Sequence, residues 1–254
     1  AASSTSTASN TRPTSAPGVA PTAVAPPAVV PGPQLPPFAA VVQGARRVDG
    51  VVTAWQRDDK VWLELTEKDF GAPFFLSPKI AGGIGEGGVL GGLMGGRTGA
   101  GGAQWVEFRR IHNQVQLIER NADHVAAAGT PEARAVAASY SPSLVGAVPV
   151  ASQPHPERKT VLVDASGLFV NDLTGMGMML QRAFRQGYSL DPRHSGIDQV
   201  RGKPDEVVFE VTNHFYTASI AIPQPTPPGA PPAPPGLQPT TPSDVPDARS
   251  LLLG

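Results

Sequence analysis

The sequence predicts a β-rich α+β domain, made mostly of antiparallel hairpins with two short helices and flanked by disordered proline-rich segments. Three observations lead to this fold class. Apolar and polar residues alternate over short runs around turn residues, as in Val51–Leu65, and period-two alternation is typical of a strand with one buried face. Two later segments carry helix start and stop signals. Of the 29 prolines, 20 fall in residues 1–37 and 223–246, so the region between them has a globular composition.

The proline distribution divides the chain into three parts. Residues 1–37 are rich in Pro, Ala, Ser and Thr, and such a segment cannot bury enough apolar surface to offset the entropy of ordering, so we expect disorder there. Residues 38–222 are expected to form the β-rich domain, with a glycine-rich loop at 81–102. Residues 223–254 are expected to be a proline-rich linker, and its apolar end, Arg249–Gly254, is interpreted as the start of a following domain.

Composition argues against several classes of function. The net charge is −1 and the chain has no basic block, whereas nucleic-acid binding draws most of its affinity from clustered Lys and Arg. No apolar run reaches the roughly 18 residues that a membrane-spanning helix needs. Cysteine is absent, which excludes disulfides, thiolate zinc ligands and a cysteine nucleophile.

The first ten residues, AASSTSTASN, are small and polar. They resemble a mature N-terminus left by cleavage of a signal peptide, which would make the protein exported, either periplasmic or secreted. A boundary inside a linker would have the same composition, so both interpretations stay open.

Hairpins dominate the first half of the central region. Arg57–Asp59 and His112–Asn113 are expected to be the turns of two hairpins. Pro73 and Pro78 should confine their strand to a sheet edge or a strand end, because proline cannot donate to a ladder. The strands expected here are 38–43, 51–56, 60–65, 72–77, 104–111 and 114–119, with Val106, Phe108, Val115 and Leu117 facing inward.

Helices and strands alternate in the second half. Thr130–Glu132 is a helix start, because Thr can cap, Pro suits the first helical position and Glu favours the positive end of the helix dipole. This helix is expected to end near Tyr140. A second helix is expected over Thr174–Gln186, with Gly187 placed to end it. The remaining expected segments are strands at 144–150, 160–164, 205–214 and 216–222, the last two paired, and Leu168–Val170 packing back after a turn.

The glycine tract at 81–102 contains two sequences that imitate phosphate-binding loops. Gly83–Gly88 fits GxGxxG, and Gly91–Thr98 resembles a P-loop in which Arg97 stands where Lys is required. The first lacks the strand before it and the helix after it, and the second lacks the lysine that reaches the phosphates. We therefore expect a surface loop, or a flap over a partner site, and no cofactor in this chain.

Residue chemistry assigns no catalytic, cofactor-binding or metal-binding set. The densest polar cluster, Asp191–His194, is interpreted as a solvated turn, with an enzyme acting through its Asp and His as an alternative. Asp164 and Asp172 are expected to cap turns rather than form a catalytic carboxylate pair, and Ser166 lacks the GxSxG elbow of a serine hydrolase. None of the five histidines lies in an HExxH zinc motif; they are His112, His124, His155, His194 and His214.

Several segments, taken in order, resemble one protein family. Asp58–Leu65, followed by Asp69–Gly71 and Phe74–Ser77, resembles the opening of domains of unknown function in exported bacterial zinc-dependent metalloproteases. The other segments similar to that family are Trp105–Arg110 with Val115–Leu117, Val161–Asp164 with Leu168–Asp172, Tyr188–Arg193 and Val207–Val211. In that family these domains precede an HExxH peptidase domain. The resemblance spans residues 51–222 and implies a zinc-binding helix downstream, beyond Gly254.

The resemblance implies that this chain is a non-catalytic N-terminal region of an exported zinc-dependent metalloprotease-like protein. It would pack on or shield the downstream peptidase domain of the same polypeptide, and zinc would be bound in that domain. The chain alone, without HExxH, is not expected to be an enzyme. The alternative is a stand-alone exported module, displayed on proline-rich stalks, that binds a protein or a glycan.

Overall fold

Two antiparallel sheets enclose the core of the protein in the computed structural model, which describes residues 34–83, 103–220, 229 and 241–254. The disorder expected before residue 34 lies outside the described residues. So do the glycine-rich loop at 84–102 and most of the proline-rich linker after residue 220.

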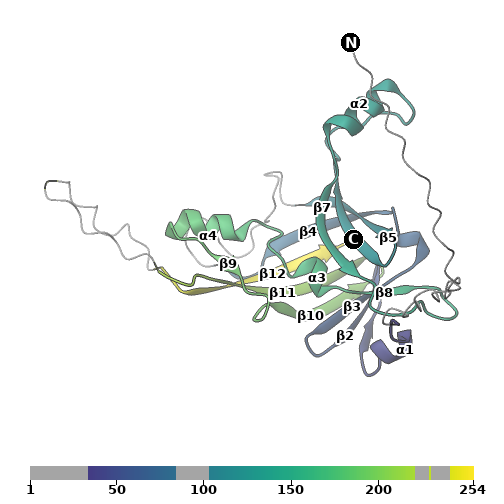
Figure 1. The fold of residues 1–254 in the computed structure, drawn as a ribbon, viewed down its shortest axis with the longest axis horizontal. Helices are drawn as coiled ribbons and strands as arrows, with labels where there is room; N and C mark the ends of the chain where they lie inside the picture. The colour runs from purple at the N-terminus through teal and green to yellow at the C-terminus, as the bar shows by residue number, and fades with distance from the viewer. Residues whose placement is uncertain (1–33, 84–102, 221–228, 230–240) are drawn as a thin grey trace, which may run out of the picture. The chain divides into compact units, whose positions relative to one another are not determined.

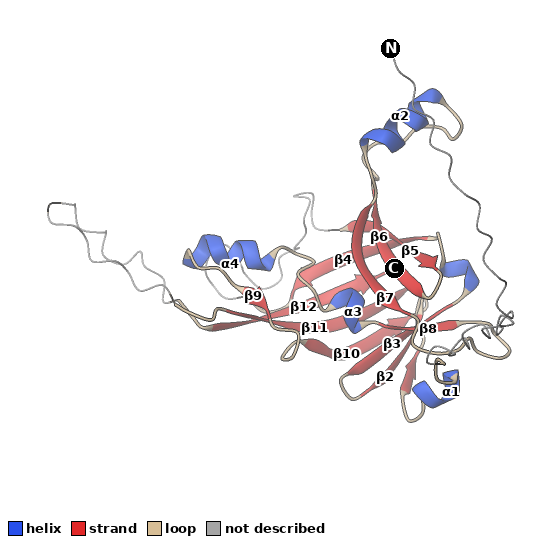
Figure 2. Ribbon diagram, viewed as in Figure 1, coloured by secondary structure: helices blue, strands red, loops and turns tan. Residues whose placement is uncertain are grey.

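Strands are the predominant secondary structure of the described residues (Figure 2). They are β1 (Arg46–Val48), β2 (Thr53–Arg57), β3 (Lys60–Leu65), β4 (Pro73–Ile80), β5 (Gln104–Ile111), β6 (Gln114–Arg120), β7 (Ser143–Pro149), β8 (Val161–Asp164), β9 (Ser189–Leu190), β10 (Gly196–Lys203), β11 (Glu206–Tyr216) and β12 (Asp244–Leu253). The helices are α1 (Phe38–Val41), α2 (Pro131–Ser139), α3 (Ser166–Phe169) and α4 (Met176–Phe184), with a 3-10 helix, η1 (Glu67–Asp69).

The smaller sheet has the strand order β1-β2-β3-β8, and the larger has the order β10-β11-β12-β4-β5-β6-β7, with β9 beside β11 (Figure 1). All of these strand pairs are antiparallel. A β-bridge between Val150 and Val163 joins the end of β7 to β8. At the other margin, the Arg46 side chain donates to the backbone oxygen of Val200, from β1 to β10, over 3.1 Å. The β-rich α+β fold class and its antiparallel hairpins are therefore confirmed.

The two predicted hairpins form where the sequence places them. β2 pairs with β3 around a turn in which Asp58 has a φ of 52°, and β5 pairs with β6 around a turn in which His112 has a φ of 54°. Asp and His adopt this left-handed conformation more readily than most residues. The four side chains expected to face inward are fully buried: Val106, Phe108, Val115 and Leu117.

The two prolines were expected to place their strand at a sheet edge or to lie at a strand end. Pro73 is the first residue of β4, as the second alternative predicts, but β4 is not an edge, because it pairs with β12 on one side and β5 on the other. Phe75 and Gly254 exchange both backbone hydrogen bonds, at 2.7 and 2.9 Å. The backbone N–H and C=O groups of odd-numbered residues in β4 therefore point toward β12, and those of even-numbered residues point toward β5. The nitrogen of Pro78 therefore points toward the β5 side, at a position beyond Leu76↔Gln104, the last pair between β4 and β5. The nitrogen of Pro73 points toward the β12 side, at a position beyond the Phe75–Gly254 pair. Neither proline removes a hydrogen bond from a ladder, which is why an interior strand accepts both.

The end of the chain belongs to the same sheet, which corrects its interpretation as a linker leading to a following domain. β12 (Asp244–Leu253) lies between β11 and β4, in register from Tyr216↔Asp244 to Val207↔Leu253. Of the strand expected at 216–222, residues 216–220 are described; Tyr216 is the last residue of β11 and residues 217–220 form no strand. β11 thus finds its partner beyond the proline-rich segment and not in the residues that follow it directly.

The two predicted helices are confirmed as α2 and α4. Thr130 caps α2 by accepting a hydrogen bond from the Ala133 N–H over 3.1 Å, and α4 ends at Arg185, whose φ of 53° supplies the left-handed residue that Gly187 was expected to supply. The segment predicted as a strand at 38–43 is instead the single-turn helix α1, and the segment expected to pack back at 168–170 contains part of the single-turn helix α3. β1, β9 and β10 were not predicted, because two of them have three residues or fewer and β10 is mostly polar.

Three clusters of apolar side chains form the core. The largest lies on the inner faces of both sheets and includes Phe108, Phe169 and Phe209, all fully buried. The second joins α4, through Met176 and Leu180, to the larger sheet. Met176 and Met179 of α4 pack in this cluster, whereas Met178 is exposed, and a flexible thioether chain suits irregular gaps. The third lies around Phe38 of α1, Trp62 and Leu162.

Gly202→Ala tests the close contact between β10 and the residues after β1. A Cβ at Gly202 would lie 2.0 Å from the backbone oxygen of Asp49, so the backbone must shift, and such overpacking costs about 1–3 kcal/mol. Gly196→Ala in the same strand is the matched control, because no atom lies within 4 Å of its added Cβ. Urea unfolding should show a lower free energy of unfolding for the Gly202 variant alone. Equal values for the two variants would contradict the contact.

Candidate functional site

A group of three polar side chains lies inside the larger sheet, on the core face of β11 and β12. Asn213, Asp247 and Arg249 are 4%, 1% and 2% exposed, and Asn213 is directly opposite Asp247 in the register. We call them the Arg249 group. The sequence analysis missed them, although one signal was present: in β12, Asp247 and Arg249 fall on the same alternating positions as Val245 and Leu251.

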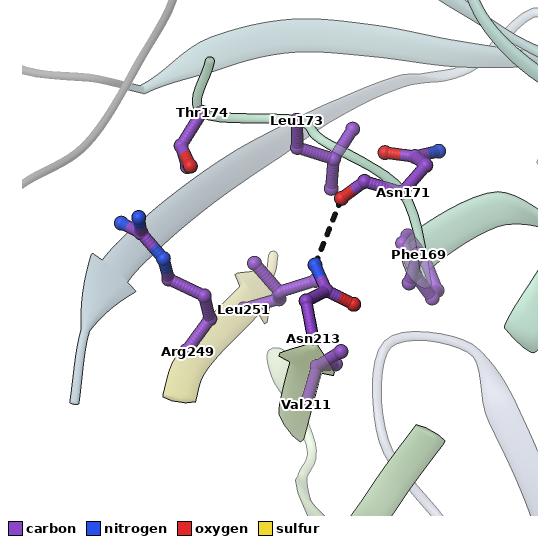
Figure 3. Close-up of a pocket in the computed structure, with 8 residues that line it drawn as sticks. All are labelled: Phe169, Asn171, Leu173, Thr174, Val211, Asn213, Arg249 and Leu251. Carbon is purple, nitrogen blue, oxygen red and sulfur yellow. Dashed lines mark hydrogen bonds between the residues drawn. The ribbon is translucent and has the colours of Figure 1, made fainter. Parts of the chain in front are cut away.

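The hydrogen bonds of the Arg249 group are incomplete among the described residues. The Arg249 Nε–H donates to Asp247 over 2.7 Å, and the Asn213 amide donates to the backbone oxygen of Asn171 over 3.0 Å (Figure 3). The terminal Nη1 and Nη2 of Arg249 have no partner there, nor does Asn213 Oδ1. The adjoining cavity has a volume of about 10 Å³, which is the space of about one water molecule. This cavity suits an ordered water and is too small for a substrate.

Burial dominates the electrostatics of the Asp247–Arg249 pair. Desolvation raises the pKa of Asp247 above its usual value, and the hydrogen bond and charge of Arg249 act in the opposite direction without cancelling it. A buried pair of this kind is costly to break, since the remaining charge is left without compensation. The arrangement therefore indicates a structural role for the Arg249 group.

A second buried carboxylate, that of Glu64 in β3, has hydrogen-bond donors on both of its oxygens. It accepts hydrogen bonds from the Trp55 indole at 2.9 Å, from Arg158 at 2.8 Å and from the Thr160 hydroxyl at 2.7 Å. Burial raises the pKa of Glu64, but these three donors outweigh it and hold that pKa below its usual value. Glu64 is thus kept ionised as the anchor of the loop before β8, and both of its oxygens are occupied.

A hollow lies between α2 and the outer face of β5 and β6. We call it the α2 groove; its volume is about 470 Å³. α2 stands off the end of β6 and β7 (Figure 1) and has no buried residue. The rings of His124 and Tyr140 are 4.1 Å apart at its margin. The residues that line the groove include Glu107, Arg109, Arg120, Val125, Ala133, Val136, Ala137 and Tyr140.

The sheet side of the α2 groove is charged. Glu107, 9% exposed, pairs with Arg109 at 2.7 Å and approaches Arg120 at 3.5 Å. One carboxylate thus lies between two guanidinium groups, and the three together carry a net positive charge. The groove combines the apolar side of α2, formed by Ala133, Val136 and Ala137, on one wall with this excess of positive charge on the other.

The polar cluster singled out by the sequence, Asp191–His194, is extended by two distant residues. His194 Nδ1 lies 2.7 Å from Asp191, and the ring of His214, on β11, has its centre 6.2 Å from that of His194. His214 Nδ1 in turn lies 2.9 Å from Asp244 of β12. Sequence reasoning found the first pair because it is local, and it missed the second because β11 and β12 meet only in the folded chain.

The other residues considered from the sequence have structural partners. Asp164 accepts from the Ser166 N–H at 2.8 Å, and Asp172 accepts from the Met176 and Gly177 N–H groups at 2.5 and 3.0 Å. These are the capping roles expected of both carboxylates. Within the described ranges, no group of three or more His, Asp or Glu side chains is placed to hold a metal ion. No helix of those ranges is both long and apolar enough to cross a membrane.

Replacing Arg249 tests whether the Arg249 group is structural. Arg249→Met leaves Asp247 buried without its cation, so the free energy of unfolding should fall by about 3–5 kcal/mol. The double variant Asp247→Leu, Arg249→Met removes both charges and should recover most of that loss. Urea denaturation of both variants measures the difference. A double variant no more stable than Arg249→Met would contradict a purely structural pair.

Comparison with known proteins gives one match. No curated protein and no solved structure matches the chain. The family described as "Domain of unknown function (DUF5117)" matches residues 98–234. This match covers more than half of the 254 residues and contains α2, α4 and both His194 and His214, whereas β12 lies outside it. The chain therefore belongs to the DUF5117 family.

Proposed function

We propose that this chain is a non-catalytic region of an exported zinc-dependent metalloprotease-like protein and that it packs on, or shields, a peptidase domain of the same polypeptide. The zinc would be bound in that domain. Two things support the proposal: the resemblance of the ordered segments in residues 51–222, and the α2 groove as a surface on which another domain could dock.

The uncovered apolar side of α2 is the observation that carries the proposal. Val136 and Ala137 of this nine-residue helix face the groove, and Val125 beside them is 80% exposed. An isolated helix of this length is marginal in water, and most helices are stabilised by packing of an apolar face. A second surface that covered this side would supply such packing, at about 25 cal/mol per Å² of apolar surface removed from water.

The charges of the groove specify what the docked surface should carry. Arg109 and Arg120 share the single carboxylate of Glu107, so an acidic side chain on the partner would complete the pairing. The partner surface is therefore expected to present apolar side chains toward α2 and at least one Asp or Glu toward β5 and β6. Charge pairs at the rim of an interface affect specificity and association rate more than affinity.

Hydrogen exchange tests this docking directly. The amides of residues 133–140 should exchange rapidly in the isolated chain and at least tenfold more slowly in the parent protein, because a docked domain would cover α2. The amides of α4 are the internal control, since α4 already packs on the core through Met176 and Leu180. Equal exchange of α2 in both proteins would contradict docking at this surface.

A pair of variants sharpens this test. Val136→Asp places a charge inside the α2 groove and should remove the added protection in the parent, while the stability of the isolated chain changes by about 0.5 kcal/mol or less. Ala138→Asp puts the same charge on an exposed position of α2 that does not line the groove. It should leave the protection intact. Loss of protection in both variants would point to unfolding of α2 instead of a lost contact.

The alternative function, a stand-alone exported module that binds a protein or a glycan, uses the same groove. The adjacent rings of His124 and Tyr140, tilted by 50° to each other and lying beside Asn121, favour it, because ligand sites are commonly lined by aromatic side chains with a few polar groups. The reading frame beyond the codon for Gly254 separates the two functions. A downstream HExxH helix supports the accessory region, and its absence supports the stand-alone module.

A further inference from the structure

We propose that His194 and His214 form a binding site for a divalent transition-metal ion of the class that prefers imidazole ligands, such as Zn²⁺. The site lies on the outer side of β11, at the turn between β9 and β10. It is separate from the α2 groove, and it does not depend on the function proposed above. The proposal is carried by the geometry of the two imidazoles and by the carboxylate that orients each of them.

The backbone holds the two histidines next to each other. The Asp191 N–H donates to the His214 backbone oxygen over 2.7 Å. The Ser195 hydroxyl donates to the Asp191 backbone oxygen over 2.7 Å and accepts from the His214 N–H over 2.9 Å. Three hydrogen bonds thus fix the turn that carries His194 onto the strand that carries His214. The relative position of the two rings is set by the fold and not by their own flexible side chains alone.

Each ring is oriented by a carboxylate on its Nδ1. The His194 Nδ1 lies 2.7 Å from Asp191, and the His214 Nδ1 lies 2.9 Å from Asp244. An ionised carboxylate only accepts, so Nδ1 carries the proton in both rings and the lone pair of a neutral imidazole lies on Nε2. No described residue is a hydrogen-bond partner of either Nε2. Histidines that bind metal have this arrangement, with the second nitrogen donating to a carboxylate.

Asp191 is well suited to this orienting role. Its Oδ1 accepts hydrogen bonds from the backbone N–H and the Nε–H of Arg193, at 3.0 and 3.3 Å, while its Oδ2 contacts His194. The side chain of His214 is 29% exposed and that of His194 is 67% exposed. A cation can therefore reach both rings from solvent.

The spacing of the rings is slightly wider than one shared ion requires. The ring centres are 6.2 Å apart, with an angle of 59° between the planes. Two imidazoles that each bind zinc at about 2.1 Å place their ring centres roughly 5–6 Å apart. A small rotation of the more exposed His194 closes the difference. Two protein ligands leave the other positions of a tetrahedral ion to water or to a group from a partner.

The charges around the site favour a cation. Asp191 and Asp244 contribute two negative charges, and Arg193 contributes one positive charge, with its Nε 3.3 Å from Asp191. Tyr216, on the same strand as His214, is the other titratable side chain near Arg193. The Arg193 side chain is 82% exposed, so it can turn away from an arriving ion. The cluster as a whole is net negative when both imidazoles are neutral.

Calorimetric titration of the tag-free 254-residue chain with Zn²⁺ at pH 7.5 tests the site. We expect saturable binding of one ion per chain, and no binding of Mg²⁺, which prefers oxygen ligands. His194→Ala and His214→Ala should each weaken Zn²⁺ binding at least tenfold. Asp244→Asn, which changes only an orienting group, should weaken it about tenfold. At pH 5.5 binding should weaken because protons compete for the same nitrogens.

His112→Asn is the matched control, because it removes the imidazole and Asn tolerates the φ of 54° at this position. His112 lies in the exposed turn between β5 and β6, so its loss should leave Zn²⁺ binding unchanged. Thermal unfolding in EDTA should give every variant the same midpoint as the wild type, which separates loss of a ligand from loss of the fold. The absence of one-to-one Zn²⁺ binding, or unchanged binding by the His194→Ala, His214→Ala double variant, would overturn the proposal.

Discussion

The larger sheet depends on the pairing of β12 with its two neighbours. β12 forms ten register pairs with β11 and five with β4. No other described strand joins β11 to β4, so without β12 the ladders of β9, β10 and β11 would be separated from those of β4 to β7. β12 also brings Val245, Leu251 and Leu253 into the core. One ten-residue strand therefore holds together parts of the chain that are distant in sequence.

The hairpins could be predicted from sequence because their information is local. The alternation of Lys60–Leu65 and the turn at Asp58 lie within ten residues of each other, and a tight turn fixes the register of the strands that it joins. The partner of β11 could not be predicted in this way. The proline-rich segment before Asp244 indicates a domain boundary by composition, but composition does not say whether the chain returns. The two prolines of β4 were misleading for a related reason, because their effect depends on which side of the strand each nitrogen faces.

The candidate sites show the same division between local and distant information. Asp191 and His194 stand out in the sequence because they are three positions apart, and the structure shows that they are in contact. His214 joins them through the contact of β9 and the following turn with β11, and Asp244 joins through the pairing of β11 with β12. The Arg249 group and the exposed surface of α2 were also missed. The burial of the Arg249 group and the exposure of α2 are properties of the folded chain. The family match, which ends at residue 234, likewise stops before the strand that completes the sheet.

Native-state hydrogen exchange of β12 tests the central claim that the chain after the proline-rich segment belongs to the fold. Strands that share a ladder of ten pairs should open together. The amides of residues 245–253 that are bonded to β11 are therefore predicted to exchange with the same free energy of opening as those of residues 207–215. Exchange of β12 at the rate of exposed loops, with β11 still protected, would contradict the account.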